Sequence, residues 1–192
     1  MTLANKVSVF RILLVPVFCG CAIYYAESVQ TGVEDKRWQV ATIAVFALAA
    51  LSDALDGWLA RTMNQRTRLG AILDPLADKL LMLAAMIILS VTPWPQRLPL
   101  FLPILAVSHA VLTIIAAFVI DHVAGHCRII PHWTGKVSTA LQMVAVLWSM
   151  IGIATPPVFW PAALAGVFTV WSGWVYLMDG AGQLARGMQK NE

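Results

Sequence analysis

Six apolar stretches, each close to 20 residues long, limit the folds open to this chain of 192 residues. A helix needs about 20 mostly apolar residues to cross the hydrocarbon core of a membrane. Only 12% of the residues are charged, against roughly 25% in soluble proteins. These features predict an all-α integral membrane protein with six transmembrane helices. The predicted spans are 9–26, 39–60, 70–92, 98–120, 136–155 and 159–179.

The first eleven residues differ from the spans that follow. Leu3, Val7 and Phe10 are spaced for one face of a helix, and the polar residues among them lie off that face. This pattern predicts a short amphipathic helix that lies in the membrane interface before the first span. A signal peptide is the alternative, and the five further spans argue against its cleavage. We expect residues 1–192 to form a single membrane domain.

The distribution of basic residues predicts the orientation. Six spans place both termini on one side, and ten of the thirteen Lys and Arg residues fall on that side. The positive-inside rule then places the termini and the loops at 61–69 and 121–135 in the cytoplasm, in a cytoplasmic (inner) membrane. The ten are Lys6, Arg11, Arg61, Arg66, Arg68, Lys79, Arg128, Lys136, Arg186 and Lys190, and the other three are Lys36, Arg37 and Arg97.

Four of the ten acidic residues crowd into 26 consecutive positions. Asp53 and Asp56 fall at the cytoplasmic end of the second span, and Asp74 and Asp78 at the cytoplasmic start of the third. On the second span, the two acids share an arc of roughly 100° with small residues at 57 and 60. On the third, Asp74 and Asp78 share an arc of roughly 80° with the glycine at 70. We therefore expect the four carboxylates to meet at one membrane depth.

Four carboxylates in a partly dry site repel one another unless protons or cations neutralise them. Oxygen ligands suit Mg²⁺ or Mn²⁺, and four carboxylates can hold two such ions, as in sites for phosphoryl chemistry. Gly57, Ala60 and Gly70 leave room for a ligand, and the Arg61 guanidinium suits phosphate oxygens. The pattern predicts a two-metal site for a diphosphate.

Other interpretations of these residues exist. A single Asp in a span can relay protons or bond a neighbouring helix, and small residues can serve packing alone. A small cation-coupled transporter would use the same buried acids, but it predicts paired broken helices in the two halves of the chain. No second acidic cluster follows Lys79. Nucleic acid is not an expected partner, because the net charge is only +3 and no aromatic-and-basic pattern is present.

The stretch from Asp53 to Asp78 resembles the signature of the CDP-alcohol phosphatidyltransferase family at every fixed position, and the six-span layout extends the likeness over nearly the whole chain. The resemblance implies a metal-dependent enzyme that transfers a phosphatidyl group from a CDP-linked lipid to an alcohol and releases CMP. It implies that Asp53, Asp56, Asp74 and Asp78 bind two divalent ions, with Asp78 as the catalytic base. It also implies that Gly57, Ala60, Arg61 and Gly70 hold the cytidine diphosphate of CDP-diacylglycerol.

Within the family, three stretches are similar to the subgroup whose acceptor is sn-glycerol 3-phosphate. They are "NKVSVFRILLVPVF", "LGAILDPLADKLL" and "PHWTGKVSTALQMVAV". The resemblance implies that Lys136, Arg11 and, as a weaker candidate, Arg128 meet the acceptor's phosphate. The chain departs from the subgroup at Ser108 and His109, where an Arg followed by an acid is usual. A subgroup that makes cardiolipin with phosphatidylglycerol as acceptor therefore stays an alternative.

The resemblance also implies a homodimer in contact with membrane lipid. Small residues such as Ala162 and Gly166 would permit close packing between helices. The three cysteines have no spacing typical of a disulfide framework or a zinc site, and we interpret them as small apolar side chains.

Overall fold

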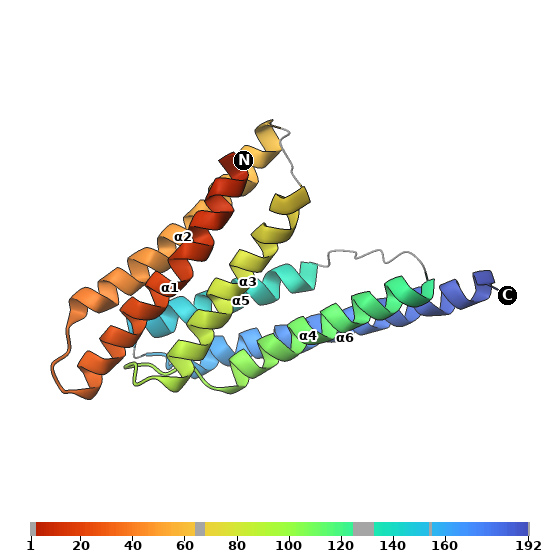
Figure 1. Cartoon of the computed structure of the whole chain (residues 1–192). Helices are drawn as coiled ribbons and strands as arrows, with labels where there is room; N and C mark the ends of the chain where they lie inside the picture. Colours follow the sequence, from red (N-terminus) through yellow and green to blue (C-terminus); the bar gives the residue numbers. More distant parts are fainter. Residues whose placement is uncertain (1–2, 64–67, 125–132, 154, 192) are drawn as a thin grey trace. The chain divides into compact units, whose positions relative to one another are not determined.

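The computed structural model describes the backbone of residues 3–63, 68–124, 133–153 and 155–191, and the side chains of 9–52, 79–116, 118–119, 133–153 and 155–182. Within this backbone the chain forms six helices and no strand (Figure 1). The prediction of an all-α protein is confirmed. The helices are α1 (Leu3–Gln30), α2 (Lys36–Met63), α3 (Arg68–Val91), α4 (Phe101–Ala124), α5 (Trp133–Ile151) and α6 (Phe159–Asn191).

The first helix corrects one prediction. A separate interfacial helix over the first eleven residues is wrong, because α1 runs unbroken from Leu3 to Gln30. No glycine or proline occurs between Leu3 and Val15, so nothing in this segment ends a helix. Pro16 lies inside α1, where its ring removes one backbone donor without ending the helix.

Two helices end at a glycine in the left-handed conformation. Gly32 follows α1 with a φ of 77°, and Gly152 follows α5 with a φ of 75°. Glycine adopts this conformation without the steric cost of a Cβ atom. The Gly152 amide donates to the Trp148 carbonyl at 3.2 Å, which satisfies one carbonyl of the last turn of α5.

Two helices in the described part of the chain have the length and composition of membrane spans. They are Val9–Gln30 in α1 and Phe159–Gly182 in α6. Shorter apolar segments lie at Lys79–Val91 in α3 and Phe101–Ala116 in α4. The described part of the chain is thus helical. The predicted spans at 9–26 and 159–179 coincide with the two helices that have the length and composition to cross a membrane.

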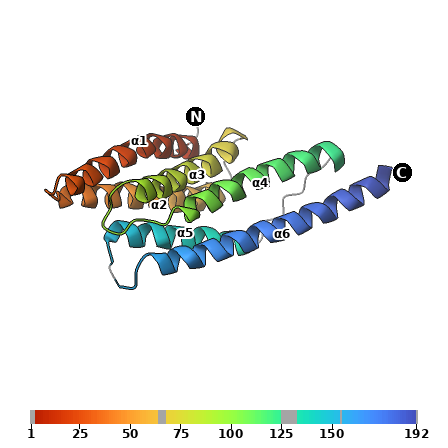
Figure 2. The same ribbon diagram turned by 90° about the horizontal axis from the view of Figure 1, so that it is seen from below.

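The chain forms two compact units. The first comprises residues 1–98 and 146–157, and the second comprises residues 99–145 and 158–192. In the first unit, α1 packs against both α2 and α3 (Figures 1 and 2). The Phe18 and Phe46 rings lie 5.9 Å apart between α1 and α2. The Tyr25 ring at the end of α1 meets the buried Trp94 ring edge-on at 4.5 Å, just beyond α3.

Two side chains of this unit donate hydrogen bonds to backbone carbonyls of distant segments. The Gln39 amide of α2 donates to the Met150 carbonyl in the last turn of α5 at 2.9 Å. The Ser149 hydroxyl donates to the Gln96 carbonyl in the loop after α3. The last four carbonyls of a helix have no partner within it, so the Gln39 bond satisfies one such group from a distant part of the sequence.

The second unit is built on α4 and α6, which run side by side in the same direction (Figures 1 and 2). Two glycines of α6 make the close approach possible. A Cβ atom at Gly166 would lie 3.1 Å from Cε2 of Phe101, and one at Gly173 would lie 3.3 Å from Cδ2 of His109. Both distances are tighter than ordinary contact. The two glycines therefore serve packing between α4 and α6, as small residues commonly do in membrane helices.

This packing changes the interpretation of Ala162 and Gly166. The sequence suggests them as small residues for close helix packing in a dimer. Ala162 is fully buried within the chain, and Gly166 faces Phe101 and Leu105 of the same chain. Both residues are covered within the chain itself, so a second copy of the chain would have to dock on other residues.

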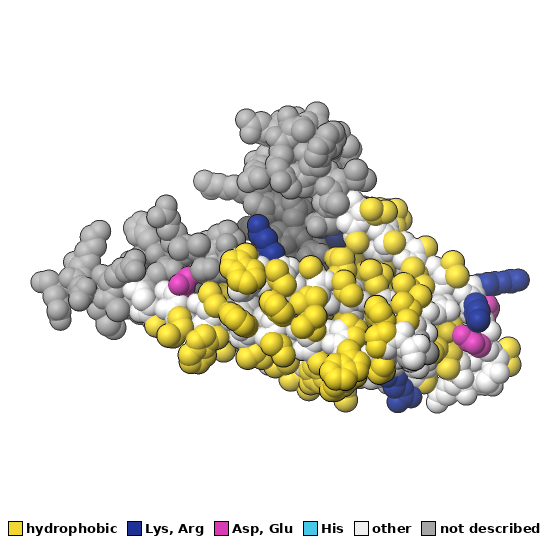
Figure 3. All heavy atoms as spheres, turned by 180° about the vertical axis from the view of Figure 1, so that it is seen from behind, with side chains coloured by type: hydrophobic (Ala, Val, Ile, Leu, Met, Phe, Trp, Pro, Cys, Tyr) yellow, Lys and Arg dark blue, Asp and Glu magenta, His cyan; other side chains and the backbone are white. Residues whose placement is uncertain are grey.

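Apolar side chains cover much of the described surface. In the view of Figure 3, apolar side chains dominate the described face, and most of its few charged side chains lie toward its margins. Along α6, a stripe of exposed apolar residues repeats at intervals of three and four, which is the spacing of one helical face. A face of this kind suits contact with lipid. The stripe consists of Trp160, Leu164, Val167, Trp171, Trp174 and Met178.

Candidate active site

The four aspartates lie on two consecutive helices of the first unit. Asp53 and Asp56 fall within the last eleven residues of α2, and Asp74 and Asp78 within the first eleven residues of α3. Only residues 64–67 separate the helices, so the two helix ends lie within about 19 Å of each other. The backbone thus places both acid pairs on neighbouring helix ends. Their side chains lie outside the described residues, and their convergence stays a prediction.

The residues expected to hold the nucleotide share these two helices. Gly57, Ala60 and Arg61 belong to α2, and Gly70 is the third residue of α3. Their side chains also lie outside the described part. Gly57 lies inside a helix, where glycine costs about 1 kcal/mol relative to alanine. The missing side chain leaves room for a ligand to approach the helix backbone closely.

The donor set of the motif fits a hard divalent cation. Among the side chains that the structure describes, no three His, Cys, Asp or Glu residues gather in a group that could hold a metal ion. The side chains of the four aspartates of the motif lie outside the described part of the chain. Carboxylate oxygens are the ligands that Mg²⁺ and Mn²⁺ prefer, so the chemistry of these four residues matches the predicted ions.

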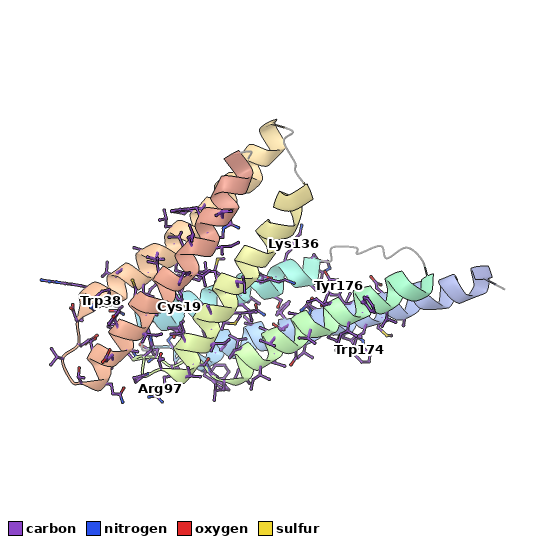
Figure 4. All side chains as sticks on the ribbon, in the orientation of Figure 1. Cys19, Trp38, Arg97, Lys136, Trp174 and Tyr176 are labelled. Atoms are coloured by element: carbon purple, nitrogen blue, oxygen red, sulfur yellow. The ribbon has the colours of Figure 1, made fainter. Side chains whose placement is uncertain are left out.

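The basic residues expected to bind the acceptor's phosphate belong to different units of the chain. Arg11 lies on α1 in the first unit and is buried, with 1% of its surface exposed. Lys136 lies in the first turn of α5 in the second unit and is exposed (Figure 4). Arg128 lies outside the described residues. A buried guanidinium needs polar or anionic neighbours. The burial of Arg11 therefore implies such neighbours, which the sequence alone does not indicate.

A buried polar cluster joins α5 to α6 within the second unit. The Ser138 and Thr169 hydroxyls lie 2.8 Å apart, and the Gln142 amide donates to Thr169 Oγ1 at 2.8 Å. Thr169 in turn donates to the Ala165 carbonyl. Gln142 belongs to the stretch "PHWTGKVSTALQMVAV", one of the three that resemble the subgroup. The structure shows that its side chain bonds α5 to α6.

A second group of contacts in the second unit joins α4, α5 and α6. The rings of His109 on α4 and Tyr176 on α6 meet edge-on, with centroids 5.9 Å apart and planes at 77°. A Cβ atom at Gly135 of α5 would lie 3.8 Å from both Cε2 and Oη of Tyr176 and 3.5 Å from the Ser172 hydroxyl. Tyr176 therefore lies between the first turn of α5 and His109.

Sequence reasoning does not identify Tyr176, Ser172, Ser138 or Thr169. Isolated hydroxyl residues in an apolar helix carry no motif, and only the packing of α4, α5 and α6 brings them together. The helical spacing of Thr134, Ser138 and Gln142, each four residues apart, is the one signal in the sequence that marks a polar face on α5.

Comparison with known proteins identifies the family. The family described as CDP-alcohol phosphatidyltransferase matches residues 1–178. A CDP-diacylglycerol–glycerol-3-phosphate 3-phosphatidyltransferase of Pseudomonas fluorescens is 32% identical over 190 residues, covering 92% of this chain and 89% of the relative. Proteins of the same name are also 32% identical in Salmonella paratyphi A, over 92% of this chain and 93% of theirs, and in Escherichia coli K12, over 88% and 90%. With the motif on α2 and α3 in place, this chain belongs to the CDP-alcohol phosphatidyltransferase family.

Proposed function

We propose that this protein transfers the phosphatidyl group of CDP-diacylglycerol to sn-glycerol 3-phosphate, giving phosphatidylglycerophosphate and CMP in phospholipid biosynthesis. The observation that carries the proposal is the near full-length similarity to relatives named for this reaction. The complete acidic motif on α2 and α3 supports it. The comparisons give no support to the transporter alternative.

The donor is proposed to bind at the ends of α2 and α3. Arg61 pairs with the diphosphate oxygens through its forked guanidinium. Gly57, Ala60 and Gly70 present no side chain larger than a methyl group, so the nucleotide approaches the helix backbone closely. Asp53, Asp56, Asp74 and Asp78 hold two divalent ions, Mg²⁺ or Mn²⁺. When bound there, such ions would supply positive charge next to the diphosphate.

The proposed transfer is a single displacement. The Asp78 carboxylate accepts the proton of the acceptor hydroxyl. The acceptor oxygen forms a bond to the phosphorus that carries diacylglycerol, and the bond from that phosphorus to the oxygen of CMP breaks. CMP leaves as a phosphate anion, and Arg61 stabilises the charge that develops. Lys136, Arg11 and, more weakly, Arg128 are proposed to hold the phosphate of the acceptor.

An acceptor panel tests this function. The purified protein receives CDP-diacylglycerol and Mg²⁺ with glycerol 3-phosphate, with phosphatidylglycerol or without acceptor, and released CMP is measured together with the lipid product. We expect CMP and phosphatidylglycerophosphate with glycerol 3-phosphate alone. Turnover with phosphatidylglycerol but not glycerol 3-phosphate would move the assignment to the cardiolipin-forming subgroup, which the departure at Ser108 and His109 keeps as the alternative.

The proposed enzyme spans the cytoplasmic membrane six times, with its termini and active site in the cytoplasm. The two spans found by length and composition lie in α1 and α6. The excess of basic residues on the side of the termini supports the orientation. We further propose that the protein acts as a homodimer in contact with membrane lipid, in keeping with its family resemblance.

Cysteine labelling tests the orientation. After the three native cysteines are replaced, Val33→Cys is expected to react with an impermeant maleimide in intact cells, because Val33 is 75% exposed in the loop between α1 and α2. Gln65→Cys is expected to react only after the cells are permeabilised. Labelling of position 65 from outside would reverse the orientation and place the active site on the outer face.

A further inference from the structure

One of the two residues at which this chain departs from the subgroup that uses glycerol 3-phosphate, His109, has defined contacts in the second unit. His109 lies on α4 with its ring edge-on to Tyr176. On α6, Gly173 lies so close that a Cβ atom there would come within 3.3 Å of the His109 ring. His109 thus packs against Gly173 of α6, and a residue larger than glycine at position 173 would push on the His109 ring.

Tyr176 extends this contact to α5. Its ring and hydroxyl approach Gly135, at 3.8 Å from the site of a Cβ atom. Lys136 follows Gly135 directly in the first turn of α5 (Figure 4). The contacts therefore run from His109 through Tyr176 to the backbone that carries Lys136, and all four residues belong to the second unit.

We propose that His109 is a positioning residue for acceptor binding, because it holds Tyr176 against the first turn of α5 and thereby fixes the place of Lys136. This inference rests on the proposed function, in which Lys136 binds the acceptor's phosphate. His109 acts through packing of its ring and does not touch the substrate. The role predicts an effect on acceptor binding that is separate from donor binding.

The test compares His109→Ala with His109→Phe in steady-state kinetics, using the acceptor that the wild-type enzyme consumes. His109→Ala removes the ring and is expected to raise the KM for the acceptor roughly three- to tenfold, the range expected for loss of one aromatic contact. The KM for CDP-diacylglycerol should stay within twofold. His109→Phe keeps a ring at the same place and should recover most of the acceptor affinity.

Two glycines of α6 supply a matched pair of further variants. Gly173→Ala pushes on the His109 ring and should raise the acceptor KM as His109→Ala does. Gly166→Ala places an equally tight methyl group against Phe101 of the same two helices, away from His109 and Tyr176, and should leave the acceptor KM unchanged. Thermal unfolding of all four variants in detergent separates altered binding from lost stability.

Three outcomes would overturn the inference: an unchanged acceptor KM in His109→Ala, an equal rise in both KM values, or a rise in Gly166→Ala that matches Gly173→Ala. Failure of the proposed function has a different result, because the wild-type enzyme would then not consume glycerol 3-phosphate. The variants are in that case measured with the acceptor that the panel identifies, and the same comparison decides the role of His109.

Discussion

Asp78→Asn is expected to lower turnover by roughly 10²–10⁴-fold, the range for loss of a general base. An amide at this place cannot accept the proton of the acceptor hydroxyl. Asp78 lies one helical turn beyond Asp74 on α3, so the variant keeps three of the four carboxylates. The protein should still insert in the membrane and bind CDP-diacylglycerol with Mg²⁺. CMP release and equilibrium binding of the donor, measured on the same preparation, check both parts.

Asp53→Asn and Asp56→Asn are the matched comparisons, because they change the same functional group on the other helix. Each should lower the rate and also raise the Mg²⁺ concentration needed for half-maximal activity. Asp78→Asn should mainly lower the rate. Near-normal turnover of Asp78→Asn would remove this residue from the role of base.

Lys136→Ala is expected to raise the KM for glycerol 3-phosphate about ten- to a hundredfold, as loss of one charged hydrogen bond would. Lys136 is the fourth residue of α5 and is exposed. The first amides of a helix lack partners within it and favour anions, so the lysine and the helix start can bind the same phosphate. The KM for CDP-diacylglycerol should change little. Steady-state kinetics with each substrate varied in turn provides the measurement.

A topological anchor is the competing role for Lys136, since basic residues at the cytoplasmic ends of spans orient membrane proteins. Lys190→Ala, which removes a lysine predicted to lie on the same side of the membrane, near the end of α6, is the control for loss of a cytoplasmic charge. It should leave both KM values unchanged. Unaltered acceptor kinetics in Lys136→Ala would exclude this residue from the acceptor site.

The sequence predicts the helices well because lipid imposes one simple condition, which is about 20 apolar residues in succession. Breaks at polar and proline-rich segments mark most of the observed ends. The same reasoning fails at the start of α1, where a change from amphipathic to apolar character does not interrupt the helix. The hydrophobic pattern indicates whether a segment lies in lipid, at the interface or in water. The ends of helices depend instead on residues that interrupt the helical backbone, such as Gly32 and Gly152.

Contacts between helices are much harder to predict. Gln142 stands out through the family resemblance, but its partner Thr169 lies 27 residues away and carries no motif. His109 is visible in the sequence only as a departure from the expected residues. Its contacts with Gly173 and Tyr176 follow from how α4 and α6 pack, and periodicity along one helix contains no information about the facing helix. The aspartates are the opposite case, because their spacing alone assigns them to two helix ends.

The bond from Gln39 to Met150 has a consequence for biosynthesis. The two residues are 111 positions apart, so α1, α2 and α3 emerge from the ribosome well before the end of α5 exists. The Ser149 hydroxyl, which bonds the loop after α3, arrives equally late. The hydrogen bonds that join the end of α5 to α2 and to the loop after α3 can therefore form only after α5 has been synthesised. A chain that stops short of residue 146 contains every aspartate of the motif, yet it lacks the segment that closes the opposite end of the unit carrying them.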